Sequence, residues 1–298
     1  MYNKRLSQRL SGYIGANEKG PWGKKGRELG IDSLRGHSPV ATTSLDFGEI
    51  PVPSAAALAD TPLSWTVTEV GVLAGNSIVA NSSNGYLLVT PGTAADTGYG
   101  LQALTTDVSP TKVMGFAPST SMSTANLVRD FYWGARIAFS TNTTWDNALF
   151  FGLGSSDTTQ LSTTTGLPAF SNAIGFNIDN TGAITIGRQV TTTWSSSSAF
   201  TKTATNLAHS SSSFRAQDFH DYFFWAHWSQ VNTSSAVQTL QAYIDGNFVG
   251  ERLLTTLPTT TATMYNSLAV YNGDAANVTL AVSNIVNGYI RTTSHGRD

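Results

Sequence analysis

The run from Tyr222 to Trp228 constrains the fold more than any other stretch, because it is made of large or apolar residues except for His227. Successive side chains of a β-strand point to opposite faces, so a strand with this composition is apolar on both faces. Such a strand needs a layer of structure on each side. The run therefore predicts a central strand, covered by a second sheet that the rest of the chain builds. One face would carry Tyr222, Phe224, Ala226 and Trp228, and the other Phe223, Trp225 and His227.

The segment after this run predicts a hairpin. Residues 238–245 alternate in polarity, with Leu240, Ala242 and Ile244 on one face. Asp245-Gly246 then supplies two residues that tolerate positive φ, as a tight turn between antiparallel strands requires.

Strand patterns recur from Thr61 onward, and we find no convincing helical period or fixed internal repeat. Many short alternating segments separated by turn residues are typical of a two-sheet antiparallel sandwich or jelly roll. The serine-rich stretch 195–213 is expected to be a long loop or an edge strand. The other expected strands are 63–68, 86–90, 131–139, 148–153, 173–179, 182–190, 264–271 and 278–290.

The composition excludes several classes of chemistry. The chain has 298 residues and no cysteine, so thiol redox chemistry and thiolate metal sites are ruled out. No apolar run of about 18 residues is present, so no membrane-spanning helix is expected. The first residues also lack the apolar core of a signal peptide. We expect a protein that either stays in the cytoplasm in which it is made or leaves it by a route other than ordinary secretion, such as being built into a particle.

Charge divides the chain into a basic arm and a mildly acidic body. Residues 1–37 hold eight of the seventeen Lys and Arg residues and three of the nineteen Asp and Glu residues, a net charge of +5. The remainder, with nine basic and sixteen acidic residues, carries −7. We predict an extended N-terminal arm over 1–45, a linker over 46–60 and the jelly-roll sandwich over 61–298. The expected partner-binding residues of the arm are Lys4, Arg5, Arg9, Lys19, Trp22, Lys24, Lys25, Arg27 and Arg35.

Two other interpretations of the arm remain open. It could be a disordered leader without a partner. It could also contact nucleic acid through its cations, with Trp22 stacked on a base. We consider nucleic acid unlikely as a partner, because the basic residues form no compact patch in the sequence.

The order of motifs resembles the concanavalin A-like, or laminin-G-like, jelly roll. Its β-glucanases carry a short histidine-aromatic strand followed by a tyrosine-valine-aspartate-glycine turn. His220-Asp-Tyr222 and Tyr243-Ile-Asp245-Gly246 resemble that signature. Segments 131–139, 150–154 and 175–186 follow in the order of the earlier strands. The resemblance spans residues 61–292 and implies the fold, because the shared motifs are mostly structural.

The catalytic signature of those β-glucanases is missing. They place Glu-x-Asp-x-Glu on one strand, since retaining hydrolysis needs two carboxyl groups about 5 Å apart. This chain has five glutamates, and no two are closer than ten residues. We therefore predict that the protein is not an enzyme and needs no cofactor. The glutamates are Glu18, Glu28, Glu49, Glu69 and Glu251.

Metal binding is not predicted either. His220 and His227 are seven residues apart and would lie on opposite faces of an unbroken strand, which does not suit a shared zinc ion. Asp218, His220 and Asp221 could contribute to a calcium or transition-metal site. The preferred interpretation is that they form a turn at the start of a strand.

A jelly-roll body on a basic arm resembles tailed-bacteriophage virion proteins, notably capsid decoration (cement) proteins. The resemblance implies a non-enzymatic role on the capsid surface, where the arm would bind the major capsid protein or other virion proteins and stabilise the shell. It also implies a homo-oligomer, for which a trimer is common in such proteins.

The alternative function is carbohydrate binding, as a lectin-like module or as a tail or receptor-binding component of a virion. The ligand would then be a host surface glycan. Aromatic residues in polar, loop-like surroundings are the candidates for stacking on sugars. They are Tyr99, Trp145 and Trp194.

Overall fold

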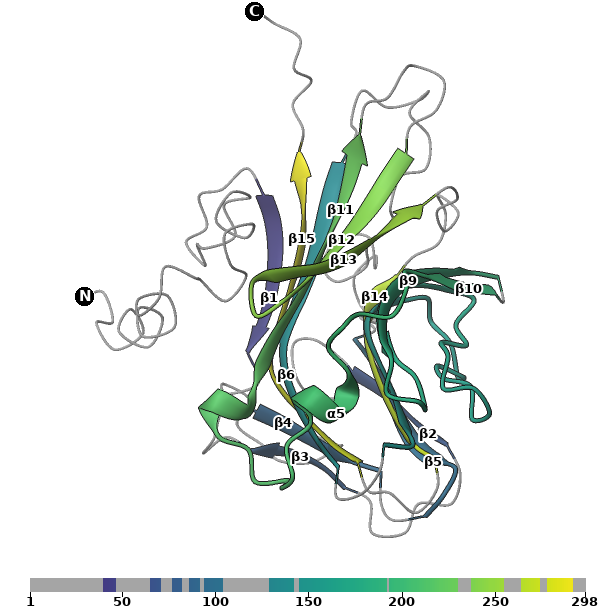
Figure 1. Cartoon of the computed structure of the whole chain (residues 1–298), viewed down its shortest axis with the longest axis vertical. Coiled ribbons are helices and arrows are strands. Elements are labelled where there is room, and N and C mark those ends of the chain that lie inside the picture. Colours follow the sequence, from purple (N-terminus) through teal and green to yellow (C-terminus); the bar gives the residue numbers. More distant parts are fainter. Residues whose placement is uncertain are drawn as a thin grey trace, which may run out of the picture.

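The structure is a computed structural model, and its strands form two sheets that lie face to face (Figure 1). It describes residues 40–46, 65–70, 77–81, 86–91, 94–103, 129–141, 145–191, 193–229, 237–254, 264–273 and 278–291.

All pairings between the named strands of these residues are antiparallel. An eight-stranded sheet runs in the order β13-β12-β11-β6-β15-β4-β3, with β1 on β15, and a seven-stranded sheet runs β10-β9-β8-β7-β14-β5-β2. The chain is thus an all-β, two-sheet jelly-roll sandwich, as the alternation predicts. The first sheet contains β1 (Val40–Asp46), β3 (Ser77–Asn81), β4 (Tyr86–Thr90), β6 (Arg129–Thr141), β11 (His220–Ser229), β12 (Val237–Ile244), β13 (Asn247–Leu254) and β15 (Val278–Arg291). The second contains β2 (Trp65–Val70), β5 (Thr97–Ala103), β7 (Asn147–Gly154), β8 (Asn172–Ile178), β9 (Ile184–Val190), β10 (Thr193–Ser196) and β14 (Tyr265–Asn272).

Strand β11 is central, as its apolar run predicts, because it lies between β12 and β6. Tyr222 and Phe224 point into the core between the sheets. Phe223 and Trp225 point to the outer face of the eight-stranded sheet, where they are also buried. The side chains of 227–229 lie outside the described residues, so the predicted positions of His227 and Trp228 stay predictions.

A stack of aromatic rings joins the two sheets. Trp133 of β6 stacks on Phe224 at 5.8 Å between ring centroids and on Phe151 of β7 at 6.3 Å. The indole N–H of the fully buried Trp133 donates to Asn266 Oδ1 at 2.9 Å, and Asn287 Nδ2 donates to the same oxygen at 2.6 Å. The polar groups of Trp133, Asn266 and Asn287 in this apolar core therefore pair with each other.

The hairpin between β12 and β13 turns at the predicted dipeptide. Asp245 has φ of 53° and Gly246 has φ of 72°. Both values lie in the left-handed region, which aspartate tolerates and glycine adopts freely.

Residues 40–45, which the sequence assigns to the arm, belong to the eight-stranded sheet instead. Together with Asp46 they form β1, which pairs with residues 284–290 of β15. The physical reason is that the VATTSLD segment contains β-branched residues suited to a strand, and β15 offers an edge for pairing there. The rest of the predicted arm, 1–39, and residues 47–60 of the predicted linker lie outside the described residues.

The serine-rich stretch combines both expected forms. It begins in the edge strand β10 and continues as a loop with one short helical turn, α5 (Ala204–Leu207); a second turn, η2 (Ala216–Asp218), follows it. Strand β5 was not predicted, because its glycines obscure the alternation of polar and apolar residues that indicates a strand. Within the described part of the chain, no helix is long and apolar enough to cross a membrane.

Candidate functional site

The outer face of the seven-stranded sheet has a floor of glycines. Gly152, Gly175 and Gly187 are direct neighbours across β7, β8 and β9. Ile174 and Phe176 point into the core, so Gly175 between them faces outward. Because glycine has no side chain, other parts of the chain approach the backbone closely along this row.

A loop of residues 155–171 packs on the same outer face beside these glycines, where Leu161 and Phe170 form a cluster with Phe150 and Ala269. Its base is held by Asp157, whose Oδ2 accepts hydrogen bonds from the backbone N–H of Ser171 at 3.1 Å and from its hydroxyl at 3.2 Å. Near the end of the loop, Phe170 packs on Phe150 with ring centroids 4.9 Å apart. The protein's own loop therefore covers part of this face.

Beside this loop the sheet carries an open recess of about 300 Å³. Trp194 of edge strand β10 forms part of its wall. The indole lies so close over Gly187 that a Cβ there would be 2.8 Å from Trp194 Cζ2, and it meets Phe150 edge-on at 6.3 Å. Packing thus holds the ring in place. The other lining residues include Ser162, Thr165, Leu167, Pro168 and Gln189.

Two buried polar atoms of the recess residues have no hydrogen-bond partner in the part of the chain that the structure describes. They are Gln189 Oε1 and Trp194 Nε1, and the two residues are directly opposite each other on β9 and β10. A buried polar group without a partner costs about 1–3 kcal/mol. Such groups are few in native proteins, and each one calls for an explanation.

Of the three aromatic residues expected to stack on sugars, only Trp194 lines this recess. Tyr99 and Trp145 are buried in the core between the sheets, with 5% and 7% of their surface exposed. The Trp145 indole donates to the carbonyl of Asp179 at 2.8 Å and meets Phe139 edge-on. The structure therefore corrects the expectation that Tyr99 and Trp145 stack on sugars. Alternation along β5 turns the Tyr99 ring inward, and the contact with Phe139 holds the Trp145 ring in the core. The expected arm residues, from Lys4 to Arg35, lie outside the described residues.

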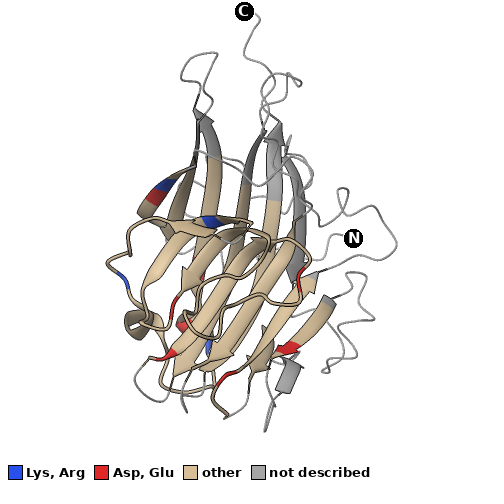
Figure 2. Ribbon diagram, turned by 90° about the vertical axis from the view of Figure 1, so that its right-hand side faces the viewer, with Lys and Arg blue, Asp and Glu red and all other residues tan. Residues whose placement is uncertain are grey.

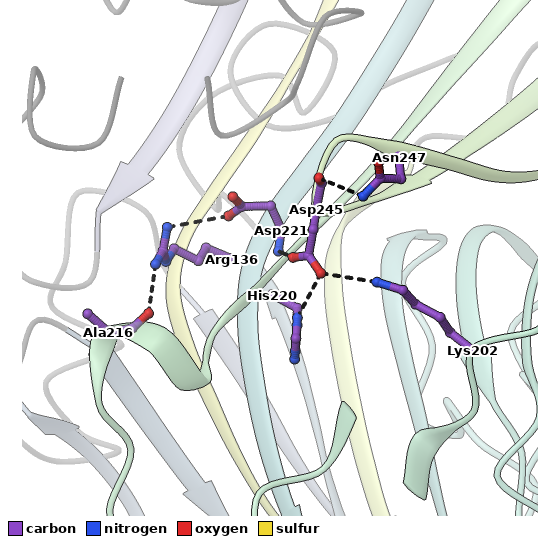
Figure 3. A network of polar contacts seen from close by, with 7 residues as sticks. All are labelled: Arg136, Lys202, Ala216, His220, Asp221, Asp245 and Asn247. Atoms are coloured by element: carbon purple, nitrogen blue, oxygen red, sulfur yellow. Dashed lines mark hydrogen bonds and ion pairs between the residues drawn. The ribbon is translucent and has the colours of Figure 1, made fainter. Parts of the chain in front are cut away.

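A second polar cluster lies at the start of β11 (Figure 3). Asp245 Oδ2 is 2.9 Å from His220 Nδ1 and 3.2 Å from Lys202 Nζ, while its Oδ1 accepts the backbone N–H of Asp221 at 3.1 Å. Asp221 Oδ1 in turn is 3.7 Å from Arg136 Nη1. The cluster ties the hairpin turn, the neighbouring strands and the segment around Lys202 together.

The two carboxyl groups of this cluster have opposite pKa shifts. Burial raises the pKa of Asp221 to about 7, although the charge of Arg136 acts in the other direction. Burial alone would also raise the pKa of Asp245, but the hydrogen bond and charge of His220, the Asp221 amide and Lys202 together lower it. Divergent carboxyl pKa values also occur at acid–base sites. Here each carboxyl group is bound to neighbouring cations or amides, which favours a structural role.

The three residues weighed as a metal site have separate partners. Asp218 accepts the backbone N–H of Arg215 at 2.7 Å and lies 3.6 Å from His209 Nε2. Asp221 and His220 belong to the cluster above. Among the described residues, no group of three His, Asp or Glu side chains is arranged to hold a metal ion.

Comparison with known proteins identifies no family for this chain. No family model matches the chain, and no curated protein is similar to it in sequence. A solved protein of unknown function from Shewanella oneidensis MR-1 is similar, with 13% identity, a TM-score of 0.49 and coverage of 91% of this chain and 96% of that one.

Two further similar structures are a prokaryotic β-1,3-1,4-glucanase from a mouse hindgut metagenome and the carbohydrate recognition domain of Emp46p. The glucanase has 10% identity, a TM-score of 0.44 and coverage of 84% of this chain and 99% of that one. The Emp46p domain has 11% identity, a TM-score of 0.42 and coverage of 77% and 90%. Because these TM-scores are below 0.5, the similarities carry no argument about function.

Proposed function

We propose that the protein is a non-catalytic carbohydrate-binding module whose sugar site is the recess beside Trp194. The observation that carries this proposal is that a packed tryptophan, hydroxyl side chains and a glutamine amide line one open cavity. Ligand sites of this size combine apolar and aromatic walls with a few polar groups that orient the ligand.

A sugar ring matches this lining chemically. Its C–H face packs against an aromatic side chain, while its hydroxyl groups exchange hydrogen bonds with Ser162, Thr165 and the amide of Gln189. At about 0.3 kcal/mol for each of about twelve non-hydrogen atoms, one hexose would bind with a Kd of about a millimolar. Tighter binding would require several sugar residues or several copies of the module.

The absence of catalysis is part of the proposal. Among the described residues that line the recess there is no Asp, Glu or His, the residue types that supply general acids and bases. Asp221, the described carboxyl group with the strongly raised pKa, is held beside Arg136 on the other sheet.

The test is a glycan array on the full chain, followed by titration calorimetry on the best ligand. Trp194→Ala should weaken binding at least tenfold, and Ser162→Ala with Thr165→Val should weaken it severalfold with the fold intact. Phe248→Ala is the matched control, because Phe248 is an exposed aromatic on the opposite sheet. Unchanged binding in the Trp194 variant would refute the site.

A second candidate function rests on the division of charge between residues 1–37 and the remainder. The protein would then be a virion structural protein, a decoration protein on the capsid surface. Its basic arm would bind the major capsid protein or another virion protein and thereby stabilise the shell, and the body would form a homo-oligomer, for instance a trimer. A binding partner specific for the assembled shell stabilises it by mass action.

Cosedimentation with undecorated shells tests this candidate. A chain with Lys24, Lys25 and Arg27 changed to glutamine should lose binding, whereas Arg215→Gln in the body should retain it. Equal binding of both variants would show that these arm residues do not bind the shell.

A further inference from the structure

Two arginines converge on one serine at the edge of the sandwich. Ser195 of β10 is directly opposite Arg188 of β9, so their side chains share a face. That face is the inner one, because Ile184 and Ile186 on the same side of β9 belong to the core. Arg252 reaches Ser195 from the other sheet.

Arg252 lies on β13, which faces β9 across the sandwich (Figure 1). It is opposite Leu240 of β12, whose side chain is in the core, so Arg252 also points inward. Its Nη2 donates to Ser195 Oγ at 2.6 Å. Arg188 and Arg252 therefore both point to the seam between the sheets, next to edge strand β10, and the charge of Arg252 acts on Arg188.

No ion pair among the described residues neutralises the positive charges of this pair. Within the described part of the chain, neither Arg188 nor Arg252 makes an ion pair, and Arg252 Nε is buried without a hydrogen-bond partner. Burial and the nearby charge of Arg252 both lower the pKa of Arg188. Charged positions are sparse on the body as a whole (Figure 2), which makes an unpaired cationic pair unusual.

Partly buried cations that repel each other destabilise a fold unless something compensates them. The ligand that compensates two guanidinium groups is an oxyanion, because each guanidinium presents N–H donors in a planar fork that matches carboxylate, sulfate or phosphate oxygens. A hydroxyl such as that of Ser195 adds one further donor.

We propose that Arg188, Arg252 and Ser195 form an oxyanion site that binds the carboxylate or sulfate group of an acidic glycan. The identity of the ligand as a glycan rests on the proposed function. Trp194 and Ser195 are consecutive on β10 and point to opposite faces, so the two sites flank a single edge strand. One oligosaccharide passing over this edge would contact the tryptophan on one side and the arginines on the other.

The first test isolates the anion site with inorganic sulfate. Thermal unfolding of the full chain is measured in sodium sulfate and in sodium chloride at equal ionic strength, for the wild type, an Arg188→Gln/Arg252→Gln variant and an Arg215→Gln control. Arg215 is an exposed arginine outside the site, so its variant shows the effect of losing one positive charge elsewhere, against two in the double variant. Sulfate should raise the Tm of the wild type and the control more than that of the double variant. An equal rise in all three would overturn the site, since general salting-out acts on every variant alike.

The second test uses Arg188→Gln alone at low ionic strength. Removing one of two repelling charges should leave the Tm equal to or above that of the wild type in chloride, and should abolish the additional gain in sulfate. A large loss of Tm in both salts would mean that Arg188 is a structural cation, and would overturn the proposal.

The third test separates this inference from the proposed function. Full methyl esterification removes the charges of tetragalacturonate and adds a methyl group to each carboxyl group. Calorimetry should show at least tenfold tighter binding of the acidic form, lost in the double arginine variant. Binding of the acidic form that depends on Arg188 but not on Trp194 would retain the oxyanion site and refute the sugar recess. Equal binding of both forms would refute the oxyanion site and leave the Trp194 test unaffected.

Discussion

Asp245 in the turn of the β12–β13 hairpin and His220 at the start of β11 form a 2.9 Å contact between Oδ2 and Nδ1. The two residues are 25 positions apart in the sequence. The contact fixes the turn against the central strand, and Asp245 is also the residue that adopts a positive φ there. One side chain therefore satisfies both the conformation of the turn and its attachment to the sheet.

Asp245→Ala should lower the free energy of unfolding by about 2–3 kcal/mol. The substitution removes the carboxylate that accepts a hydrogen bond from the Asp221 amide and contacts His220. It also places alanine, whose side chain forms no hydrogen bond, at φ of 53°. Asp245→Asn should cost about half as much, because asparagine tolerates this conformation and still offers an acceptor oxygen. Urea unfolding of both variants measures the difference. Equal losses would mean that charge alone, and not the turn, is responsible.

The raised pKa of Asp221 predicts a specific pH dependence. Burial raises it from 3.8 to about 7, so between these values the folded state holds a proton that the unfolded state releases. The stability contributed by Asp221 is therefore complete below about pH 4 and is lost as the pH rises toward 7, with a slope of up to about 1.4 kcal/mol per pH unit. The lowered pKa of Asp245 acts in the opposite sense, and its contribution is lost as the pH falls into the acidic range.

The Asp221→Asn variant tests this dependence. Between pH 5 and 7 the wild type should lose more unfolding free energy than the variant, because the variant has no carboxyl group to ionise beside Arg136, Asp245 and His220. Parallel curves over this range would show that Asp221 ionises in the folded state as easily as in the unfolded one.

Gly187→Ala should displace Trp194. An added Cβ would lie 2.7 Å from the Ser195 carbonyl oxygen and 2.8 Å from Trp194 Cζ2, so β10 must move away from β9. We expect a loss of about 1–3 kcal/mol of stability and at least tenfold weaker glycan binding. Thr193→Ala, at an exposed position of the same strand, serves as the control and should change neither. Unchanged affinity of the Gly187→Ala variant would show that glycan binding does not depend on the position of the Trp194 indole.

Trp133→Phe should be among the most destabilising aromatic substitutions, at about 2–4 kcal/mol. The indole is fully buried, stacks between the two sheets and donates to Asn266. Calorimetric unfolding, combined with an Asn266→Leu variant in a double-mutant cycle, would isolate the hydrogen bond from the packing. A loss below 1 kcal/mol in the single variant would contradict the central role of this ring.

The strands were the predictable part of this protein. Alternation is local, so the faces of β11 follow from the order of Tyr222 to Ala226, and the turn follows from Asp245-Gly246. The edge strand β1 was harder to predict, because residues 40–46 form a strand only where β15 offers a free edge beside them. The burial of Tyr99 could have been predicted from the sequence, because Tyr99 shares a strand face with Leu101. Its glycine neighbours favoured a loop interpretation instead.

The candidate sites depend on register and on contacts between distant segments. Trp194 could be named from its polar surroundings, whereas the glycine row beneath it exists only because three strands pair with Gly152, Gly175 and Gly187 in line. Ser195 and Arg252 are 57 residues apart, and no local pattern links them.

The order of side chains along the chain thus determined that this protein is all-β, which faces of its strands are apolar and where its central hairpin turns, because strand geometry repeats every two residues. Only the tertiary structure decided which tryptophan lines a recess and which arginines meet. Those outcomes depend on how the two sheets pair and pack, and long-range pairing leaves no periodic trace in a single sequence.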